Sequence, residues 1–415
     1  VNIAARLMQH AVKMISKEQK AAREAAVSGM VRSVHMAVQE GFEAIPIDTW
    51  LLVTPQIIAR IHMPTPSVRR SVNTLLHLVA KAHPQGLIYP LIVASKSLYG
   101  GSINMFSHTL PRFGIETSFV SASDPDAMKA AIRPNTKVIF GEIIGNPGLD
   151  IMDVDRVSAI AHEAGIPLMI DATFNTPFLI QPCHHGVDII IHSLTKWIGG
   201  HGVAIGGAVV DAGRFDWGQN DKFPTIAQPH YSMDGINFHE EFGPAAFTAK
   251  FRAEAMYNFG PCLSPTNAFH IIQGMETLGL RMQRHMENTR KLLAFLSEHE
   301  QVAWVRHPEL PSHPDHELAK QLLPKGAGSI ITFGVKGGRD AGRAFIESVQ
   351  LSSHLANVGD AKTLVIHPAS TTHANLSQDE RDALALSDGF IRLSVGLEDK
   401  DDLWADIDQA LSSVS

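Results

Sequence analysis

The stretch HSLTKWIGGHG, residues 192–202, decides how the rest of the chain is interpreted. It follows the apolar run VDIIIHS (187–193), which has the length of a strand, and it ends in glycines that let backbone approach a ligand closely. Lys196 is therefore expected at the mouth of a sheet, where a partly desolvated lysine presents the neutral amine that condenses with a carbonyl. Ser193 and Thr195 place hydroxyls beside it that could bind a phosphate on the same ligand. Taken alone, the string also fits a solvent-exposed lysine after a strand.

A second string, IDATFNTP (170–177), makes the first one more specific. Its Asp171 stands 25 residues before Lys196, a distance that fits one strand–helix–strand unit. An acid at the carboxyl end of a parallel strand lies where α/β sheets bind ligands, and it can pair there with a protonated pyridine nitrogen. A helix N-cap or a loop acid is the alternative for this aspartate by itself.

The sequence around these strings predicts an α/β fold in which a mostly parallel sheet is flanked by helices. Apolar runs of strand length alternate with helical patterns such as VDRVSAIAHEAG (154–165), and the runs are apolar on both faces. We expect a large domain over 98–270 and a smaller C-terminal α+β domain over 271–415. Residues 1–97 are expected to form an all-helical segment. The runs are KVIFGEI (137–143), IPLMIDA (166–172), VDIIIHS (187–193), SIITFGV (329–335) and FIRLSV (390–395).

Composition excludes several classes of function. The 415 residues carry a net charge of −7, which disfavours non-specific binding to nucleic acid or to a membrane surface. No apolar run approaches the ~20 residues of a membrane span. Two cysteines are too few for a disulfide framework and suit a reducing compartment, so a cytoplasmic location is expected. No metal site is expected, because the candidate ligands fit no metal template. These candidates are His201, His367, His373 and the run Cys183-His184-His185.

Residues 98–414 resemble the Cys/Met-metabolism family of pyridoxal-phosphate (PLP) enzymes, of fold type I, and within it most closely the O-acetylhomoserine sulfhydrylases. The resemblance covers about three quarters of the chain in collinear order. The strings that carry it are LYGG (98–101), GNPGLDIMD (145–153), IPLMIDATFNTP (166–177), HSLTKWIGGHG (192–202), GDAKTLVIHPASTTH (359–373) and IRLSVGLED (391–399).

The resemblance implies roles for the residues that contact the cofactor. Lys196 matches the lysine that forms a Schiff base with pyridoxal 5'-phosphate, and Tyr99 matches the tyrosine that stacks on its ring and assists proton transfer. Asp171 matches the partner of the pyridine nitrogen. Ser193 and Thr195 match ligands of the phosphate.

Further roles follow from the same match. Asn146 matches an asparagine near the phenolic oxygen of the cofactor, and Thr173 is expected among the cofactor-binding residues. Arg392 matches the arginine that clamps the substrate α-carboxylate, a task that suits a planar guanidinium. Asn357 lies where the family contacts the same carboxylate.

The implied reaction is γ-replacement on O-acetylhomoserine with sulfide or a thiol, which gives homocysteine or a related product of sulfur amino-acid biosynthesis. The match through INFHEEFGPAAF (236–247) favours this activity. A methionine γ-lyase or a cystathionine γ-synthase or lyase is the alternative within the family. A non-catalytic fusion protein with a helical interaction segment is the alternative outside it. The family also implies a homo-oligomer, a dimer or tetramer, provided that the N-terminal segment permits it.

The chain departs from the family before LYGG. The Tyr-x-Arg arm and the Ser-Gly-x-Ala turn that contact the phosphate do not occur in place. Residues 40–97, with IDTWL…PQIIARI…HPQGLIYPL, resemble instead part of the FAT region of target-of-rapamycin-type kinases, which suggests a gene fusion. Charge-assisted bonds to the phosphate contribute roughly 1.5–3 kcal/mol each. Cofactor binding is therefore expected more firmly than turnover.

Overall fold

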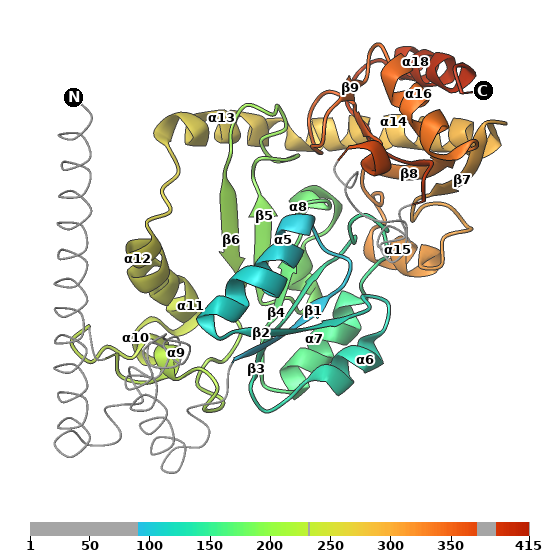
Figure 1. Cartoon of the computed structure of the whole chain (residues 1–415). Helices are drawn as coiled ribbons and strands as arrows, with labels where there is room; N and C mark the ends of the chain where they lie inside the picture. The colour runs from blue at the N-terminus through green and yellow to red at the C-terminus, as the bar shows by residue number, and fades with distance from the viewer. Residues whose placement is uncertain (1–89, 231–232, 372–386, 415) are drawn as a thin grey trace, which may run out of the picture. The chain divides into compact units, whose positions relative to one another are not determined.

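The computed structural model describes residues 90–230, 233–371 and 387–414 (Figure 1). The chain divides into two compact units, one of residues Val1–Pro90 with Phe106–Glu116, and one of Leu91–Met105 with Thr117–Ser415. In the first unit, the described residues include the 3-10 helix η3 (Leu110–Phe113), which ends at Gly114 in the left-handed region, with a φ of 75°. The candidate site lies wholly in the second unit.

Six strands form the first sheet in the order β2-β1-β3-β4-β5-β6. The pairs β1–β3, β3–β4 and β4–β5 are parallel, and only the last pair, β5–β6, is antiparallel among those whose register is described. The mostly parallel sheet of an α/β fold is thereby confirmed. The strands are β1 (Leu91–Ser95), β2 (Glu116–Val120), β3 (Thr136–Glu142), β4 (Leu168–Asp171), β5 (Ile189–Ser193) and β6 (Gly207–Asp211).

Helices between these strands supply much of the first core. Helix α7 (Val154–Glu163) begins where the Asp153 side chain accepts the Arg156 N–H, an N-cap that satisfies one of the free donors of the first turn. Its buried face packs beside β4 in a cluster of aliphatic side chains. The helix stops before Gly165, whose φ of 65° a β-carbon would strain. Other helices of this part are α5 (Gly100–Asn104), α6 (Pro125–Ala131) and α8 (Thr176–Leu179).

A second sheet lies in the C-terminal part, with strands in the order β7-β8-β11-β10-β9. Helices α14 and α16 pack on it, and α18 packs against both helices. Their buried side chains form a second core. The expected boundary at residue 270 falls inside α13 (Pro265–Glu276). The other elements are β7 (Val302–Arg306), β8 (Ile330–Val335), β9 (Ser353–His354), β10 (Leu364–Ile366), β11 (Phe390–Ser394), α14 (Leu278–Glu298), α15 (His316–Leu322), α16 (Gly338–Ser348) and α18 (Lys400–Ser412).

The structure differs from the sequence-based expectation at the end of the N-terminal segment. Residues 1–97 were expected to be helical, yet Leu91–Ser95 form strand β1 inside the first sheet. A five-residue apolar run carries too little periodicity to separate a buried strand from a buried helix turn. The remainder of that expectation, residues 1–89, lies outside the described residues. In the described part, no helix combines the length and apolarity needed to cross a membrane.

Candidate active site

Three parallel strands end in polar side chains along one edge of the first sheet. Glu142, Asp171 and Ser193 are the last residues of β3, β4 and β5, which lie side by side (Figure 1). This carboxyl edge is where open α/β sheets bind ligands. A cavity of about 300 Å³ opens there. It is lined by Tyr99, Glu142, Ile144, Asn146, Asp171, Thr173, Phe174, Ser193, Thr195, Lys196, Ile205, Ala356, Asn357, Val358 and Arg392.

Lys196 stands in the turn that follows β5, and its Nζ donates a hydrogen bond to Asn357 Oδ1. The next residue, Trp197, is fully buried, so the turn is fixed in the core below the amine. Arg281 on α14 holds the same turn by donating to the carbonyl oxygens of Trp197 at 2.6 Å and Ile198 at 3.1 Å. Burial lowers the pKa of Lys196, and the nearby Arg392 guanidinium lowers it further. Both effects favour the neutral amine.

Asp171 is joined to the end of β5 by a hydroxyl bridge. Its Oδ1 accepts from the Thr173 N–H at 3.0 Å and from Thr173 Oγ1 at 2.5 Å. That same hydroxyl oxygen accepts the Ser193 N–H at 2.8 Å. Thr173 thus ties the acid to the strand that leads to the lysine. Burial raises the pKa of Asp171, while its hydrogen bonds from Thr173 oppose that shift.

Glu142 is a site residue that the sequence-based interpretation missed. It pairs in register with Asp171 across β3 and β4, it is 5% exposed, and its Oε1 accepts the Tyr99 N–H at 2.6 Å. Burial raises the pKa of Glu142 well above its usual range, and the charge of Asp171 raises it further. The signal was present, because Glu142 is the next-to-last residue of the run KVIFGEI (137–143), just as Asp171 is the next-to-last residue of IPLMIDA (166–172).

Tyr99 stands at the rim of the cavity as the N-cap of α5, with 59% of its surface exposed. Two acids hold the segment that leads to it. Glu142 accepts its backbone N–H, and Asp150 accepts the Ser97 hydroxyl. These bonds fix the backbone that carries the Tyr99 ring, and Tyr99 lines the open side of the cavity.

The wall opposite the first sheet comes from the C-terminal part of the chain. Arg392 on β11 donates from Nη1 to Asn146 Oδ1 at 3.4 Å, and burial lowers its pKa to about 10. Asn357 lies between β9 and β10.

The Thr195 hydroxyl is bonded to the backbone of Gly206, accepting its N–H at 3.1 Å and donating to its carbonyl at 3.2 Å.

All nine predicted site residues line this one cavity, although they come from segments up to 293 positions apart, from Tyr99 to Arg392. The cavity brings together the chemical groups that PLP requires. An amine with a lowered pKa can bond to the aldehyde, an acid can pair with the pyridine nitrogen, and the Ser193 and Thr195 side chains supply hydroxyls for a phosphate. The donor set fits the cofactor.

Comparisons with known proteins agree with this donor set. Residues 71–412 match the model of the Cys/Met metabolism PLP-dependent enzyme family. The chain is 47% identical over 322 residues to homocysteine synthase of Schizosaccharomyces pombe, covering 77% of this chain and 75% of that protein. It is 44% identical over 332 residues to O-acetyl-L-homoserine sulfhydrylase of Leptospira meyeri, covering 78% and 75%. A solved structure from Campylobacter jejuni that contains N'-pyridoxyl-lysine-5'-monophosphate is 37% identical, has a TM-score of 0.74, and aligns over 78% of this chain and 77% of its own.

Proposed function

Because the chain belongs to the Cys/Met metabolism PLP-dependent enzyme family, we propose that it catalyses γ-replacement on O-acetylhomoserine with sulfide or a thiol. In this reaction the bond between the γ-carbon and the acetate oxygen breaks, and a carbon–sulfur bond forms at the same carbon. The products are acetate and homocysteine or a related thioether. The activity belongs to sulfur amino-acid biosynthesis.

Five side chains are proposed to hold the cofactor. Lys196 would bind it covalently, and Asp171 would bind its pyridine nitrogen. Tyr99 would cover its ring, while the hydroxyls of Ser193 and Thr195 would contact its phosphate. When bound, PLP supplies the electron sink that stabilises negative charge at carbons next to the substrate nitrogen.

The protein's own part in the reaction is to orient the substrate and to move protons. Arg392 offers a guanidinium fork to the α-carboxylate, and its bond to Asn146 holds that fork at the cavity wall. Asn357 lies beside the Lys196 amine and the same wall. Lys196, whose pKa is lowered by burial, is suited to remove the α-proton as a general base.

The observation that carries the proposal is that Lys196, Asp171 and Arg392 line one cavity. The test uses the purified chain with added cofactor. We expect visible absorbance that sodium borohydride abolishes, and a pyridoxyl group on Lys196 in the peptide map. O-acetylhomoserine and sulfide should then yield homocysteine. A chain that stays colourless, or a pyridoxyl group on another lysine, would contradict the proposal.

The alternatives within and outside the family are not favoured by the relatives, which are synthases and sulfhydrylases. A lyase would release an α-keto acid from methionine without sulfide, which a separate incubation with methionine and a keto-acid assay would detect. The resemblance of residues 40–97 to kinase-associated helices stays a prediction, and the family match begins within it, at residue 71. The cytoplasmic location expected from the two cysteines also stays a prediction; both Cys183 and Cys262 are free thiols.

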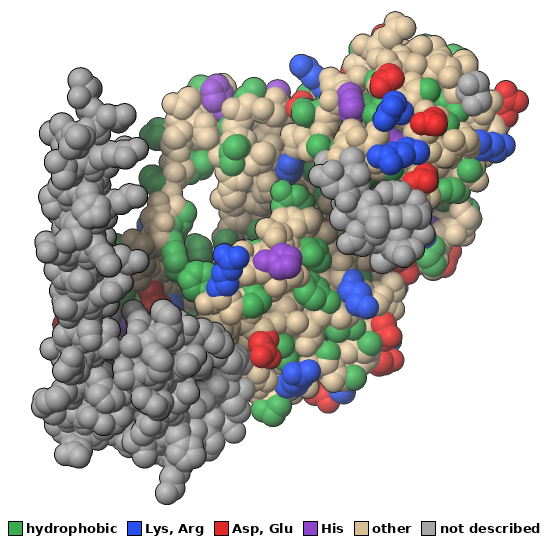
Figure 2. All heavy atoms as spheres, viewed as in Figure 1, with side chains coloured by type: hydrophobic (Ala, Val, Ile, Leu, Met, Phe, Trp, Pro, Cys, Tyr) green, Lys and Arg blue, Asp and Glu red, His purple; other side chains and the backbone are tan. Residues whose placement is uncertain are grey.

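We infer a homo-oligomer from apolar surface on the second unit. Tyr257 and Phe259 are each 83% exposed on α12 (Tyr257–Phe259), and Leu280 is 72% exposed on α14. Two exposed aromatic side chains on one short helix, as Tyr257 and Phe259 are, suit a protein–protein contact. On the face shown in Figure 2, by contrast, the region of α16 and α18 mixes basic and acidic side chains. Light scattering should give a mass above that of one 45.2 kDa chain, and a monomeric mass would contradict the inference.

A further inference from the structure

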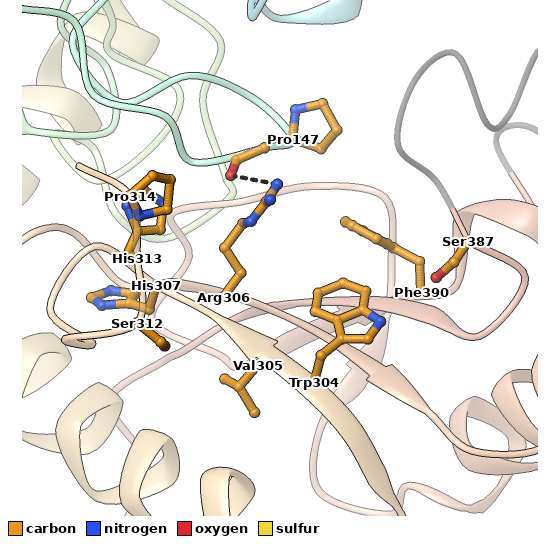
Figure 3. A pocket seen from close by; sticks show the side chains of 11 residues that line it. Pro147, Trp304, Val305, Arg306, His307, Ser312, His313, Pro314, Ser387 and Phe390 are labelled. Atoms are coloured by element: carbon orange, nitrogen blue, oxygen red, sulfur yellow. Dashed lines mark hydrogen bonds between the residues drawn. The ribbon is translucent and has the colours of Figure 1, made fainter. Parts of the chain in front are cut away.

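A second and larger cavity of about 590 Å³ opens beside Pro147 (Figure 3). In Figure 3 the Arg306 side chain extends between two walls. One wall carries the rings of Trp304 and Phe390, and the other carries His307, His313 and neighbouring residues. The cavity is lined by Pro147, Gly148, Trp304, Val305, Arg306, His307, Ser312, His313, Pro314, Ser387 and Phe390.

This second cavity shares two structural elements with the candidate active site. Asn146 lines the active-site cavity, and the next two residues, Pro147 and Gly148, line the second one. On β11, Phe390 lines the second cavity and Arg392 lines the active site. One loop and one strand therefore contribute residues to both cavities.

One basic side chain that lines the second cavity, Arg306, has no acid partner among the described residues. Arg306 donates to the Gly148 carbonyl at 3.4 Å and forms no ion pair with the acids in the described ranges. His307 is neutral, because burial lowers its pKa to about 4. The acids around it accept other hydrogen bonds, and Asp150, which lies against Gly148, accepts the Ser97 hydroxyl. Asp315 accepts the Ile151 N–H at 2.9 Å, and Glu309 pairs with Arg290 at 2.8 Å.

An apolar surface stands beside this charge. The rings of Trp304 and Phe390 have centroids 5.7 Å apart at an interplanar angle of 52°. Trp304 and Arg306 are two residues apart on β7, so their side chains leave the same face of the sheet. A ligand that meets both would carry a single negative charge on an apolar body. A phosphate dianion carries two negative charges, and Arg306 would compensate only one of them.

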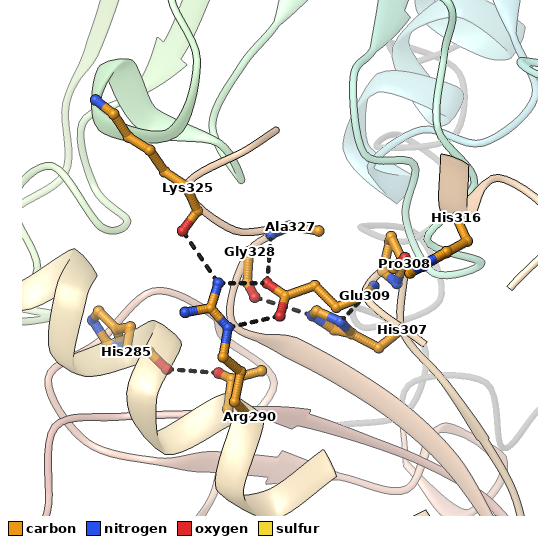
Figure 4. Close-up of polar contacts among 10 residues, drawn as sticks. His285, Arg290, His307, Pro308, Glu309, His316, Lys325, Ala327 and Gly328 are labelled. Atoms are coloured by element: carbon orange, nitrogen blue, oxygen red, sulfur yellow. Dashed lines mark hydrogen bonds and ion pairs between the residues drawn. The ribbon is translucent and has the colours of Figure 1, made fainter. Parts of the chain in front are cut away.

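Hydrogen bonds fix the wall of the cavity that contains His307 (Figure 4). The imidazole donates from Nε2 to the Gly328 carbonyl at 3.1 Å and accepts the Glu309 N–H at Nδ1 at 3.2 Å. Glu309 also accepts from Arg290 and from the Ala327 N–H at 3.0 Å. The wall is thus held in one geometry before any ligand arrives, which reduces the entropy lost on binding.

We propose that this cavity is a second binding site for a small organic monocarboxylate with an apolar body, held by Arg306 and by the Trp304 and Phe390 rings. The carboxylate accepts from the guanidinium, and the apolar body lies against the rings. Because the cavity shares the Asn146–Gly148 loop and β11 with the active site, its occupancy changes the affinity for the amino-acid substrate. By thermodynamic linkage, the substrate changes the affinity for this ligand by the same factor.

The binding test uses 3-phenylpropionate as the probe, with calorimetry on the full chain. Arg306→Gln should weaken its binding by about tenfold or more, the usual effect of losing a charge-assisted hydrogen bond. The neutral 3-phenylpropan-1-ol should bind about as weakly to the wild type. Arg156→Gln removes an exposed arginine that pairs with Asp126 and does not line the cavity, and it should bind the probe normally.

Arg392→Gln identifies which cavity the probe occupies. If this variant still binds 3-phenylpropionate and Arg306→Gln does not, the second cavity is the site. Loss of binding in Arg392→Gln alone, equal binding in Arg306→Gln, or no saturable binding to the wild type would overturn the proposal. Stronger binding of inorganic phosphate than of the probe would overturn the ligand class.

The coupling is tested in the steady state. Saturating 3-phenylpropionate should change the KM for O-acetylhomoserine in the wild type and in Arg156→Gln, and this change should disappear in Arg306→Gln. An unchanged KM in a wild type that binds the probe would overturn the coupling. The binding arm needs no turnover, so its outcome is separable from that of the proposed activity.

Discussion

The two cavities share a loop and a strand, yet they differ in how far their charged side chains are shielded from water. In the candidate active site, Glu142, Asp171, Lys196 and Arg392 are shielded from water, and the pKa of each is shifted by burial towards the neutral form. In the second cavity the charged group, Arg306, is exposed. The shielded groups of the first cavity have the shifted pKa values that are typical of catalytic sites, whereas the exposed Arg306 of the second cavity is suited to binding alone.

The two arginines give the sharpest form of this comparison. Arg392 is partly buried and desolvated, so an unpaired charge there is costly and a substrate carboxylate relieves the cost. Arg306 already reaches water, so a ligand must displace solvent for a smaller gain. We therefore expect the active site to bind its carboxylate more tightly than the second cavity does.

The largest expected effect comes from Lys196→Ala. Removing the amine removes both covalent attachment and the general base, so kcat/KM should fall by about 10³-fold or more. The visible absorbance that borohydride abolishes should be absent. Binding of 3-phenylpropionate should be unaltered, because Lys196 does not line the second cavity. Residual turnover near the wild-type rate would contradict the assignment.

The next effect is that of Asp171→Asn. An amide cannot compensate a protonated pyridine nitrogen, so kcat should fall by about 10²-fold, the typical effect of removing one preorganised electrostatic contact. Asp315→Asn is a matched control, because Asp315 also accepts a backbone N–H but lies on the side of the second cavity. An equal loss of kcat in both variants would show that the effect of Asp171→Asn is structural.

The strand ends and the residues that follow them could be predicted from the sequence. The apolar runs IPLMIDA (166–172) and VDIIIHS (187–193), which carry Asp171 and Ser193 near their ends, indicate parallel strands by composition alone, and parallel strands bring their carboxyl ends to one edge. The placement of Arg392 and Asn357 opposite Lys196 could not be derived in this way. It depends on how the second sheet packs, and the resemblance to a known family supplied it.

Other features escaped the sequence for definite physical reasons. Leu91–Ser95 is too short for its period to distinguish a strand from a helix. The place of Glu142 at a strand end could be predicted, but its hydrogen bond to Tyr99, 43 positions away, could not. The second cavity depends on Arg306 meeting Gly148 across 158 positions. No local pattern predicts contacts of that separation.

A moderate effect is expected from Glu142, which we interpret as a residue that positions Tyr99. Glu142→Gln keeps an acceptor for the Tyr99 N–H and should lower kcat/KM by less than about threefold, whereas Glu142→Ala should lower it by about tenfold or more. If Glu142 acts through Tyr99, the losses from Glu142→Ala and Tyr99→Phe should not add in the double variant.

Asp406→Asn is the control for Glu142. Asp406 also accepts backbone N–H groups, from Gln350 at 2.7 Å and Ser352 at 2.9 Å, but it is a buried residue of α18. It should lower the thermal midpoint of the cofactor-free chain without changing the KM for substrate. Additive losses in the Glu142 and Tyr99 pair, or the same profile for Glu142→Ala and Asp406→Asn, would refute the positioning role.

The smallest effect is on how stability depends on pH, and here the buried groups of the two cavities contribute with opposite signs. His307, on the wall of the second cavity, and His285, in the core, each have a pKa lowered from 6.5 to about 4 by burial. The unfolded chain therefore binds protons first as pH falls below about 6.5, and each histidine removes about 1–2 kcal/mol of stability by about pH 5. The raised pKa values of Glu142 and Asp171 act the other way, because the folded chain takes up their protons first as pH falls.

Urea unfolding of the cofactor-free chain at about pH 7 and about pH 5 separates these contributions. Glu142→Gln removes one acid that favours the folded state at low pH, so its free energy of unfolding should fall more steeply on acidification than that of the wild type. His307→Gln should fall less steeply, since an amide can still donate to the Gly328 carbonyl but takes up no proton. The two variants should thus depart from the wild type in opposite directions. If both variants depart from the wild type in the same direction, Glu142 and His307 do not contribute to the pH dependence of stability with opposite signs, and the prediction is wrong.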